Sequence, residues 1–300
     1  MSKHALIGGG TGFIGSHLVK HLLRHDYKVT TVSRMPSPKN ITWHQLEKKG
    51  LPKGVTSVVN LAGENVLNPL HRWTEGYKQN VWNSRINTSA LMVKAIQQSD
   101  DVEAYVNIIG VSHYKPNAIK IYTERDPVEG YDFLSNLCLE WEKAATLPEN
   151  IAQTTRMIKL RTGLVIGRGG GMIQAIWRPF MMGLGGPLGS GKQILPWIHL
   201  ADLSRLIHHC LENKRIKGPV NAVAPEIITN EEFSKTFAST LKRPCFFKVR
   251  ETMVNFLFGN DRSPLLLNGA KIRPDHALNS GFQFHYPTVK EACLEMTKEG

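Results

Sequence analysis

The chain has 300 residues, of which 41% are hydrophobic and 21% are charged. This composition is typical of a globular protein and excludes a disordered chain, a collagen and a disulfide-rich scaffold. No apolar run approaches the about 18 residues that a membrane helix needs, and the first residues pass into a strand without a signal-peptide pattern. We therefore expect a cytoplasmic protein with no membrane partner.

The formal net charge of +12 raises the question of an anionic partner. Lysine and arginine are scattered along the chain and form no block of five or more like charges, so we expect a solvated basic surface and no nucleic-acid partner. The four cysteines lie far apart and form no C-x-x-C pair, which argues against a disulfide framework and a zinc knuckle. We predict reduced, mostly buried cysteines and no metal site.

The first half of the chain alternates strands with helices. An apolar strand at residues 5–7 leads into a glycine turn and a helix from Phe13, and the other predicted elements follow in order. The predicted strands cover residues 28–33, 55–61, 104–109 and 156–166, and the predicted helices cover residues 85–97 and 133–145. This alternation predicts a Rossmann-type α/β fold with a doubly wound parallel sheet.

In the second half of the chain the regular alternation of strands and helices gives way to glycine-rich loops and helical patterns. Glycine-rich loops at residues 167–171 and 183–192 precede helical patterns at residues 198–211, 231–241 and 249–258. We predict an NADP-binding Rossmann domain over residues 1–223, with substrate-side loops at 167–200. Residues 224–300 are predicted to form a smaller, α-rich C-terminal lobe over the carboxyl edge of the sheet.

The glycine turn carries the clearest signal. Gly9, Gly12 and Gly15, with Gly10 in overlapping register, follow a strand and open a helix, as in the dinucleotide fingerprint. Glycines at these positions permit the tight turn, the close approach of a pyrophosphate and close helix packing, while the helix N-terminus offers free N–H groups. We predict a bound dinucleotide.

The end of the second strand distinguishes NAD from NADP. A carboxylate there binds the free ribose 2′-hydroxyl, whereas an arginine accommodates a 2′-phosphate. The strand ends at Ser33 and Arg34, and no acidic residue lies between Asp26 and Glu47. The sequence therefore favours NADP(H), with the Ser33 hydroxyl as a further phosphate donor.

Three motifs together resemble a known family. GGTGFIG at residues 9–15, NLAGEN at 60–65 and PWIHLADL at 196–203 resemble the extended short-chain dehydrogenase/reductases of the epimerase-like group. Arg72-Trp73, Ser84-Arg85, the FLSNLCLEWEKAA stretch and GFQFHYP near the C-terminus are similar to its atypical members, NADP-dependent oxidoreductases with their own C-terminal domain. The resemblance covers essentially the whole chain and implies a Rossmann fold, NADP(H) and a small-molecule substrate.

From the fingerprint and the resemblance we predict the cofactor contacts. They are Gly9, Thr11, Gly12, Phe13, Ile14, Gly15, Ser33, Arg34, Asn60, Leu61, Ala62, Gly63, Ser84, Arg85, Gly163 and Leu164. Because short-chain reductases often dimerise through two helices that correspond here to residues 85–97 and 133–145, we also expect a homodimer.

The catalytic residues are harder to place. Short-chain reductases use a tyrosine, with a lysine four residues on and a serine or threonine, for acid/base chemistry beside the nicotinamide. The helix from Phe133 has neither the tyrosine nor the lysine, and the Tyr286/Lys290 pair lies in the wrong region. Tyr114 is our candidate proton donor and Ser112 its partner, although packing alone would also explain a tyrosine at a strand end.

Two other patterns carry less weight. Residues 186–193 match a phosphate-binding loop except that Gln193 replaces the final serine or threonine, and no helix pattern follows, so we predict no nucleoside-triphosphate hydrolysis. His199 is either a catalytic base or, as we favour, a histidine that holds its loop by hydrogen bonding.

Three functional hypotheses remain from the sequence. The first is an NADP(H)-dependent oxidoreductase acting on a CH–OH or carbonyl group without the Tyr-x-x-x-Lys pair. The second is a non-catalytic NADPH-binding sensor or scaffold. The third, nucleotide-sugar epimerisation, needs the missing acid/base pair and usually NAD, and the absent carboxylate after the second strand argues against it.

Overall fold

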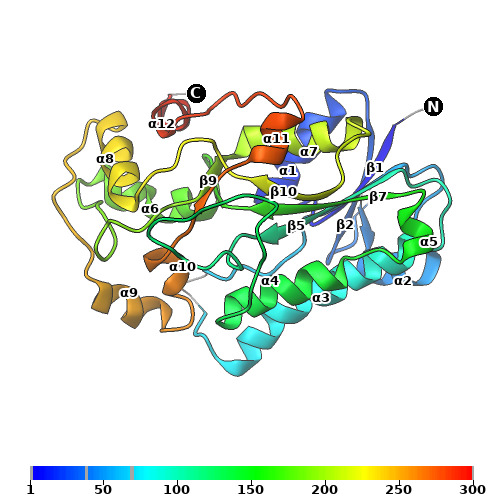
Figure 1. Cartoon of the computed structure of the whole chain (residues 1–300), viewed down its shortest axis with the longest axis horizontal. Coiled ribbons are helices and arrows are strands. Elements are labelled where there is room, and N and C mark those ends of the chain that lie inside the picture. The colour runs from blue at the N-terminus through cyan, green and yellow to red at the C-terminus, as the bar shows by residue number, and fades with distance from the viewer. Residues whose placement is uncertain (1–2, 38–39, 68–70, 299–300) are drawn as a thin grey trace.

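The computed structural model describes residues 3–37, 40–67 and 71–298. Its centre is a parallel seven-stranded sheet in the order β10-β7-β5-β4-β1-β2-β3 (Figure 1). The strand order reverses between β1 and β4, which are paired with each other, and this reversal is the point at which doubly wound sheets bind their ligands. The sheet strands are β1 (His4–Gly8), β2 (Lys28–Ser33), β3 (Asn40–Thr42), β4 (Ser57–Asn60), β5 (Ala104–Gly110), β7 (Arg156–Thr162) and β10 (Gly218–Ala222).

Helices cover both faces of this sheet, as apolar strands buried on two sides require (Figure 1). On one face α1 packs against α7, and on the other α3 packs against α2 and α4. The helices flanking the sheet are α1 (Phe13–Leu23), α2 (Trp43–Lys49), α3 (Glu75–Ile96), α4 (Phe133–Ala144), α5 (Glu149–Ala152) and α7 (Leu200–Glu212).

Most of the other elements lie beyond the carboxyl edge of the sheet, at the left of Figure 1, while α11 packs against strand β10 of the main sheet. Strand β8 pairs with β9 and strand β6 with β11, each pair parallel and separate from the main sheet. The remaining elements are β6 (Ile121–Tyr122), β8 (Leu164–Ile166), α6 (Gly171–Met181), β9 (Trp197–His199), α8 (Asn230–Thr240), α9 (Glu251–Phe258), α10 (Pro264–Leu267), β11 (Lys271–Ile272), α11 (Asp275–Asn279) and α12 (Val289–Thr297).

Apolar side chains form three large cores. One joins α1 and α7 to the sheet through Leu18 and Leu206, and another joins α2 and α3 to the opposite face through Leu46 and Met92. The third core lies outside the sheet and combines β8, β9 and α6 with α8 and α12. The C-terminal residues therefore complete a core that begins at Ile166.

The structure confirms the predicted α/β, Rossmann-type fold and corrects several elements. The strand predicted over residues 156–166 is two strands in different sheets, because the chain turns out of the main sheet at Gly163. The helix predicted over residues 85–97 begins ten residues earlier, at Glu75, and the helical pattern at 198–211 begins with strand β9. Helix α6 and edge strands β3 and β10 were not predicted. The division at residue 223 stays a prediction.

Other expectations concern the surface and the cysteines. Within the described ranges, no helix has both the length and the apolar character that a membrane span requires. Cys138, Cys210 and Cys293 are buried and unpaired, as predicted, while Cys245 is partly exposed. Helices α3 and α4 pack against each other, and their outward side chains are mainly polar. The predicted homodimer through these helices stays a prediction.

Candidate functional site

The glycine turn between β1 and α1 has the geometry its sequence predicts. Gly9 has a φ of +74°, a conformation that side chains with a Cβ rarely adopt. A Cβ on Gly15 would lie 2.2 Å from the Gly9 carbonyl oxygen, so only glycine allows α1 to begin this close to the turn. A Cβ on Gly10 would meet the Thr31 side chain of β2 at 2.5 Å.

The first turn of α1 can accept an anion. Gly12 is its N-cap and supplies no side-chain hydrogen bond, and no acidic residue occupies the first turn. The N–H groups and the positive end of the helix dipole at Phe13 and Ile14 are therefore available to a phosphate. These features fit the pyrophosphate of a dinucleotide, and the exposed Thr11 lies at the same turn.

Strand β2 ends at Ser33 at the same edge of the sheet, and Arg34 follows it directly. The Arg34 side chain is 83% exposed, and its Nη1 lies 3.3 Å from an Oε atom of Glu64. An exposed ion pair of this kind contributes little, so it can be exchanged for a phosphate at small cost. Ser33 is buried, and its hydroxyl donates to the Met35 carbonyl at 2.6 Å. A Ser33 contact with a phosphate would require this bond to be given up.

The end of β4 is held by a buried polar network. The Asn60 side-chain amide donates to Asn107 at 2.9 Å and to Ser89 at 3.1 Å, and its Oδ1 accepts from the Ala62 N–H. Trp141 on α4 donates to the same Ser89 hydroxyl. The network fixes the course of residues 60–63, where the sequence predicted cofactor contacts at Asn60, Leu61, Ala62 and Gly63.

Ser84 and Arg85 were also predicted to contact the cofactor, and the structure gives them a positioning role. The Ser84 hydroxyl accepts from the Glu64 N–H at 2.9 Å, and Arg85 donates to the Glu64 carbonyl at 2.9 Å. The Arg85 guanidinium also lies over the Trp141 ring, and burial lowers its pKa to about 10. Through these hydrogen bonds to the Glu64 backbone, both residues fix the loop that follows β4.

A cavity of about 220 Å³ opens beside the ends of β5 and β7. Neighbouring strands lie about 4.8 Å apart, so the end of β5 lies about 10 Å from the glycine turn along the same edge. The predicted residues Gly163 and Leu164 line this cavity together with C-terminal residues. Its lining also includes Gly110, Ser112, Tyr131, Asp132, Leu188, Ile194, Pro196, Leu265, Leu266 and Ala270.

The predicted catalytic residues meet different environments. Ser112 lines the cavity, as does Tyr114, but the Tyr114 side chain is only 2% exposed. The Tyr114 hydroxyl accepts from Arg161 at 2.7 Å and lies 3.0 Å from Asn221 Oδ1 and 3.2 Å from the Thr123 carbonyl. This hydroxyl is occupied by protein groups, so the geometry gives no support to Tyr114 as a proton donor.

Tyr131 is the functional candidate that the sequence analysis missed. It lines the cavity one residue before Asp132, the N-cap of α4, and its hydroxyl donates to the Ser112 carbonyl at 2.7 Å. Ser135 stands four residues on, where the short-chain reductase pattern has lysine, and its hydroxyl bonds to Asp132. A search for a tyrosine just before the helix, without the lysine, would have found it.

The remaining motif residues are structural. His199 caps α7 by accepting from the Ala201 N–H, and its Nε2 lies 3.0 Å from Glu295 on α12, which agrees with the loop-holding role we favoured. Residues 186–193 are followed by β9 and not by a helix, in line with the predicted absence of a phosphate-binding loop. Gln193 donates to the Leu188 and Leu266 carbonyls and so ties this loop to α10.

Comparison with known proteins agrees with this geometry. The profile of the NAD dependent epimerase/dehydratase family matches residues 5–223, and a domain of unknown function (DUF1731) matches residues 251–296. The chain is 43% identical over 293 residues to mouse epimerase family protein SDR39U1, covering 97% of this chain and 98% of that one. It is 33% identical over 298 residues to Bacillus subtilis epimerase family protein YfhF, covering 96% of each.

Solved structures show the same fold. The crystal structure of human epimerase family protein SDR39U1 (isoform2) with NADPH superposes with a TM-score of 0.95 at 43% identity, covering 98% of this chain and 99% of that one. A nucleoside-diphosphate sugar epimerase from Corynebacterium glutamicum has a TM-score of 0.78 at 23% identity, covering 99% of this chain and 58% of that one, and this likeness concerns the fold alone. With a family profile and full-length relatives in agreement, the chain belongs to the NAD dependent epimerase/dehydratase family.

Proposed function

We propose that the protein binds NADP(H) at the glycine turn. The first turn of α1, whose N-cap supplies no side-chain hydrogen bond, would bind the pyrophosphate. The Arg34 guanidinium would give up its ion pair with Glu64 and bind the 2′-phosphate instead. The human relative, 43% identical to this chain, was crystallised with NADPH. Among the described residues between Asp26 and Glu47, none carries a carboxylate that could bind a free 2′-hydroxyl.

We further propose an oxidoreductase that reduces a carbonyl group in a small, largely apolar substrate. The observation that carries this proposal is the cavity beside the ends of β5 and β7, because it shares the sheet edge with the glycine turn and is lined mainly by apolar residues. Its polar lining residues include Ser112, Tyr131 and Asp132, which lie between the end of β5 and the start of α4. A bound NADPH would supply hydride to the carbonyl carbon.

Tyr131 would supply the proton in this scheme, with the substrate carbonyl replacing the Ser112 carbonyl as the acceptor of its hydroxyl. Burial and the neighbouring Asp132 carboxylate raise its pKa, so the hydroxyl stays protonated and is suited to donate rather than to accept. The Lys115 ammonium lies 5.8 Å from the ring centre and is the nearby cation, in place of the lysine that the family pattern has on the helix. The proton would pass to the new hydroxyl oxygen, and solvent would restore it because the side chain is 38% exposed.

Titration of the protein with NADPH and NADH, followed by a carbonyl panel monitored by NADPH oxidation, tests both proposals. We expect tighter binding of NADPH, and turnover that falls at least about 100-fold in Tyr131→Phe with the NADPH affinity unchanged. Tyr122→Phe is the matched control, since the Tyr122 hydroxyl donates to the Lys115 carbonyl outside the cavity lining. Absence of binding by either nucleotide would refute the cofactor proposal.

The second candidate is a non-catalytic NADPH-binding sensor or scaffold. The observation in its favour is the Ser135 hydroxyl, which stands where a lysine would lower the tyrosine pKa and is instead bonded to Asp132. Tight NADPH binding without hydride transfer to any member of the panel would support this candidate. Steady turnover that Tyr131→Phe abolishes would exclude it.

A further inference from the structure

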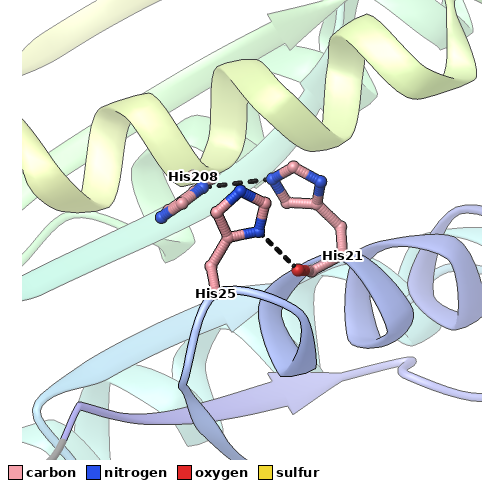
Figure 2. Close-up of side chains that lie close together, drawn as sticks. All are labelled: His21, His25 and His208. Atoms are coloured by element: carbon pink, nitrogen blue, oxygen red, sulfur yellow. Dashed lines mark hydrogen bonds between the residues drawn. The ribbon is translucent and has the colours of Figure 1, made fainter.

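Three histidines from two helices face one another on the side of the molecule where α1 packs against α7 (Figure 2). His21 lies in the last turn of α1, His25 follows the end of that helix, and His208 lies on α7. One ring nitrogen of each lies within 4.8 Å of the others. We call these three residues the histidine cluster. It is separate from the cavity and the glycine turn described above.

The sequence prediction of no metal site overlooked part of this pattern. His17, His21 and His25 are spaced four residues apart, a spacing that places side chains on one face of a helix. His208 is supplied 183 residues later in the chain, so only the folded structure brings it to the cluster. His17 itself is bonded to the Ser204 hydroxyl at 2.8 Å and stands apart from the other three.

One of the three distances between the ring nitrogens already matches that of a coordinated ion. A tetrahedral zinc ion bound at about 2.0 to 2.1 Å from each imidazole nitrogen places those nitrogens about 3.3 Å apart. His21 Nε2 and His208 Nδ1 are already 3.1 Å apart. His25 needs only a small side-chain movement to reach the same centre, and as an exposed residue it is free to make it.

Outer contacts orient two of the three rings. His25 Nδ1 lies 2.8 Å from the His21 carbonyl oxygen, so its N–H donates there and its Nε2 is left as the ligand, directed toward the other two rings in Figure 2. His208 Nε2 faces Glu212 at 3.8 Å, and Glu212 is itself held by Lys3 at 2.7 Å. Carbonyl and carboxylate partners of this kind are typical of metal-binding histidines.

The charged groups around the cluster also leave room for a cation. The hollow beside the cluster also holds Glu212, His209 and Arg205, and the Arg205 charge is paired with Asp202 at 2.8 Å. A water molecule can reach a fourth position from this hollow of about 380 Å³.

We propose that the histidine cluster binds one divalent transition-metal ion, with three imidazole ligands and an open fourth position, and that the ion links α1 to α7. Imidazole ligands suit zinc, nickel, cobalt and copper, whereas magnesium and calcium prefer oxygen ligands. Binding to the folded chain alone would stabilise it, because the third ligand joins the first two only after folding.

Titration of the full chain with zinc chloride against a chromogenic chelator tests the proposal. We expect one zinc ion per chain, an affinity at least tenfold weaker in His25→Gln and in His208→Gln, and a zinc-dependent rise in Tm that both variants lose. Cobalt chloride should give the intense visible absorption of tetrahedral cobalt in the wild type only. His25 is exposed, so His25→Gln keeps the fold, which circular dichroism verifies.

His44→Gln is the matched control, because His44 is exposed on α2 away from the cluster. Its zinc affinity and Tm shift should equal those of the wild type. Zinc affinity that is unchanged in His25→Gln, or a loss of affinity in His44→Gln of the same size, would overturn the proposal. Stoichiometric magnesium binding in place of zinc would overturn it as well.

Discussion

Arg34 is placed to read the 2′-phosphate because its guanidinium is exposed and forms a surface ion pair with Glu64. Replacement by alanine removes one charge-assisted contact, on the order of 1.5 to 3 kcal/mol. We therefore predict that Arg34→Ala weakens NADPH binding by roughly 10- to 150-fold and leaves NADH binding nearly unchanged. Fluorescence titration of both nucleotides measures this, with the exposed Arg24→Ala as control. An equal loss for both nucleotides would show that Arg34 does not read the phosphate.

His113 is fully buried between Ser112 and Tyr114, and neither ring nitrogen has a hydrogen-bond partner among the described residues. Burial, reinforced by the Arg161 charge, lowers its pKa to about 3. In the unfolded chain the His113 ring therefore binds a proton below about pH 6.5. In the folded chain the same ring stays neutral down to about pH 3. The free energy of unfolding is therefore highest above pH 6.5 as far as His113 is concerned. It decreases as the pH falls from 6.5 toward 3.

We predict that His113→Met, which removes the titrating group at similar volume, reduces the acid sensitivity of the fold. Between pH 7.5 and pH 5 the variant should lose less unfolding free energy than the wild type, by up to about 2 kcal/mol. Urea unfolding at the two pH values measures the difference, with His44→Gln as the exposed control. Identical pH dependence in His113→Met and the wild type would contradict the assignment.

At the scale of elements, the first turn of α7 anchors the segment that precedes α12. Asp202 is fully buried and accepts from the His285 and Tyr286 N–H groups, each at 2.8 Å, while Arg205 balances its charge. Asp202→Ala leaves both N–H groups and the arginine without this partner. We predict a loss of about 3 kcal/mol in unfolding free energy, measured by urea denaturation. The exposed Asp101→Ala should change stability by less than about 0.5 kcal/mol.

Element boundaries were predictable where the local chemistry was explicit. Helix α8 begins within one residue of its predicted start, because Thr229 and Glu232 form a capping box. Helix α3 begins ten residues before its prediction, because its first turns are largely polar and carry a glycine and two asparagines, which obscure the helical period. The strand break at Gly163 was not predictable, because the alternating apolar and polar residues of β7 and the apolar residues of β8 both favour a strand. The Pro196 backbone, just before β9, is what leaves no room for a side chain at Gly163.

At the scale of the molecule, the glycine turn and the cofactor were predictable and the substrate cavity was not. The glycine turn is a local motif, whose meaning depends on a strand before it and a helix after it. The cavity is assembled from residues as distant as Ser112 and Ala270, and the histidine cluster joins His21 to His208. Tertiary packing alone brings such residues together, and a single sequence does not encode it as a local pattern.

The third core has a consequence for how the chain is made. Its apolar members run from Ile166 and Trp197 to Met296, so it draws on residues on both sides of the boundary between the two family matches. During synthesis the ribosome must release the chain through Met296 before these side chains can be enclosed. Until then the side chains of Ile166 and Trp197 are exposed to water, although the strands of the main sheet have already been synthesised. We expect a chaperone to bind the nascent chain at that stage.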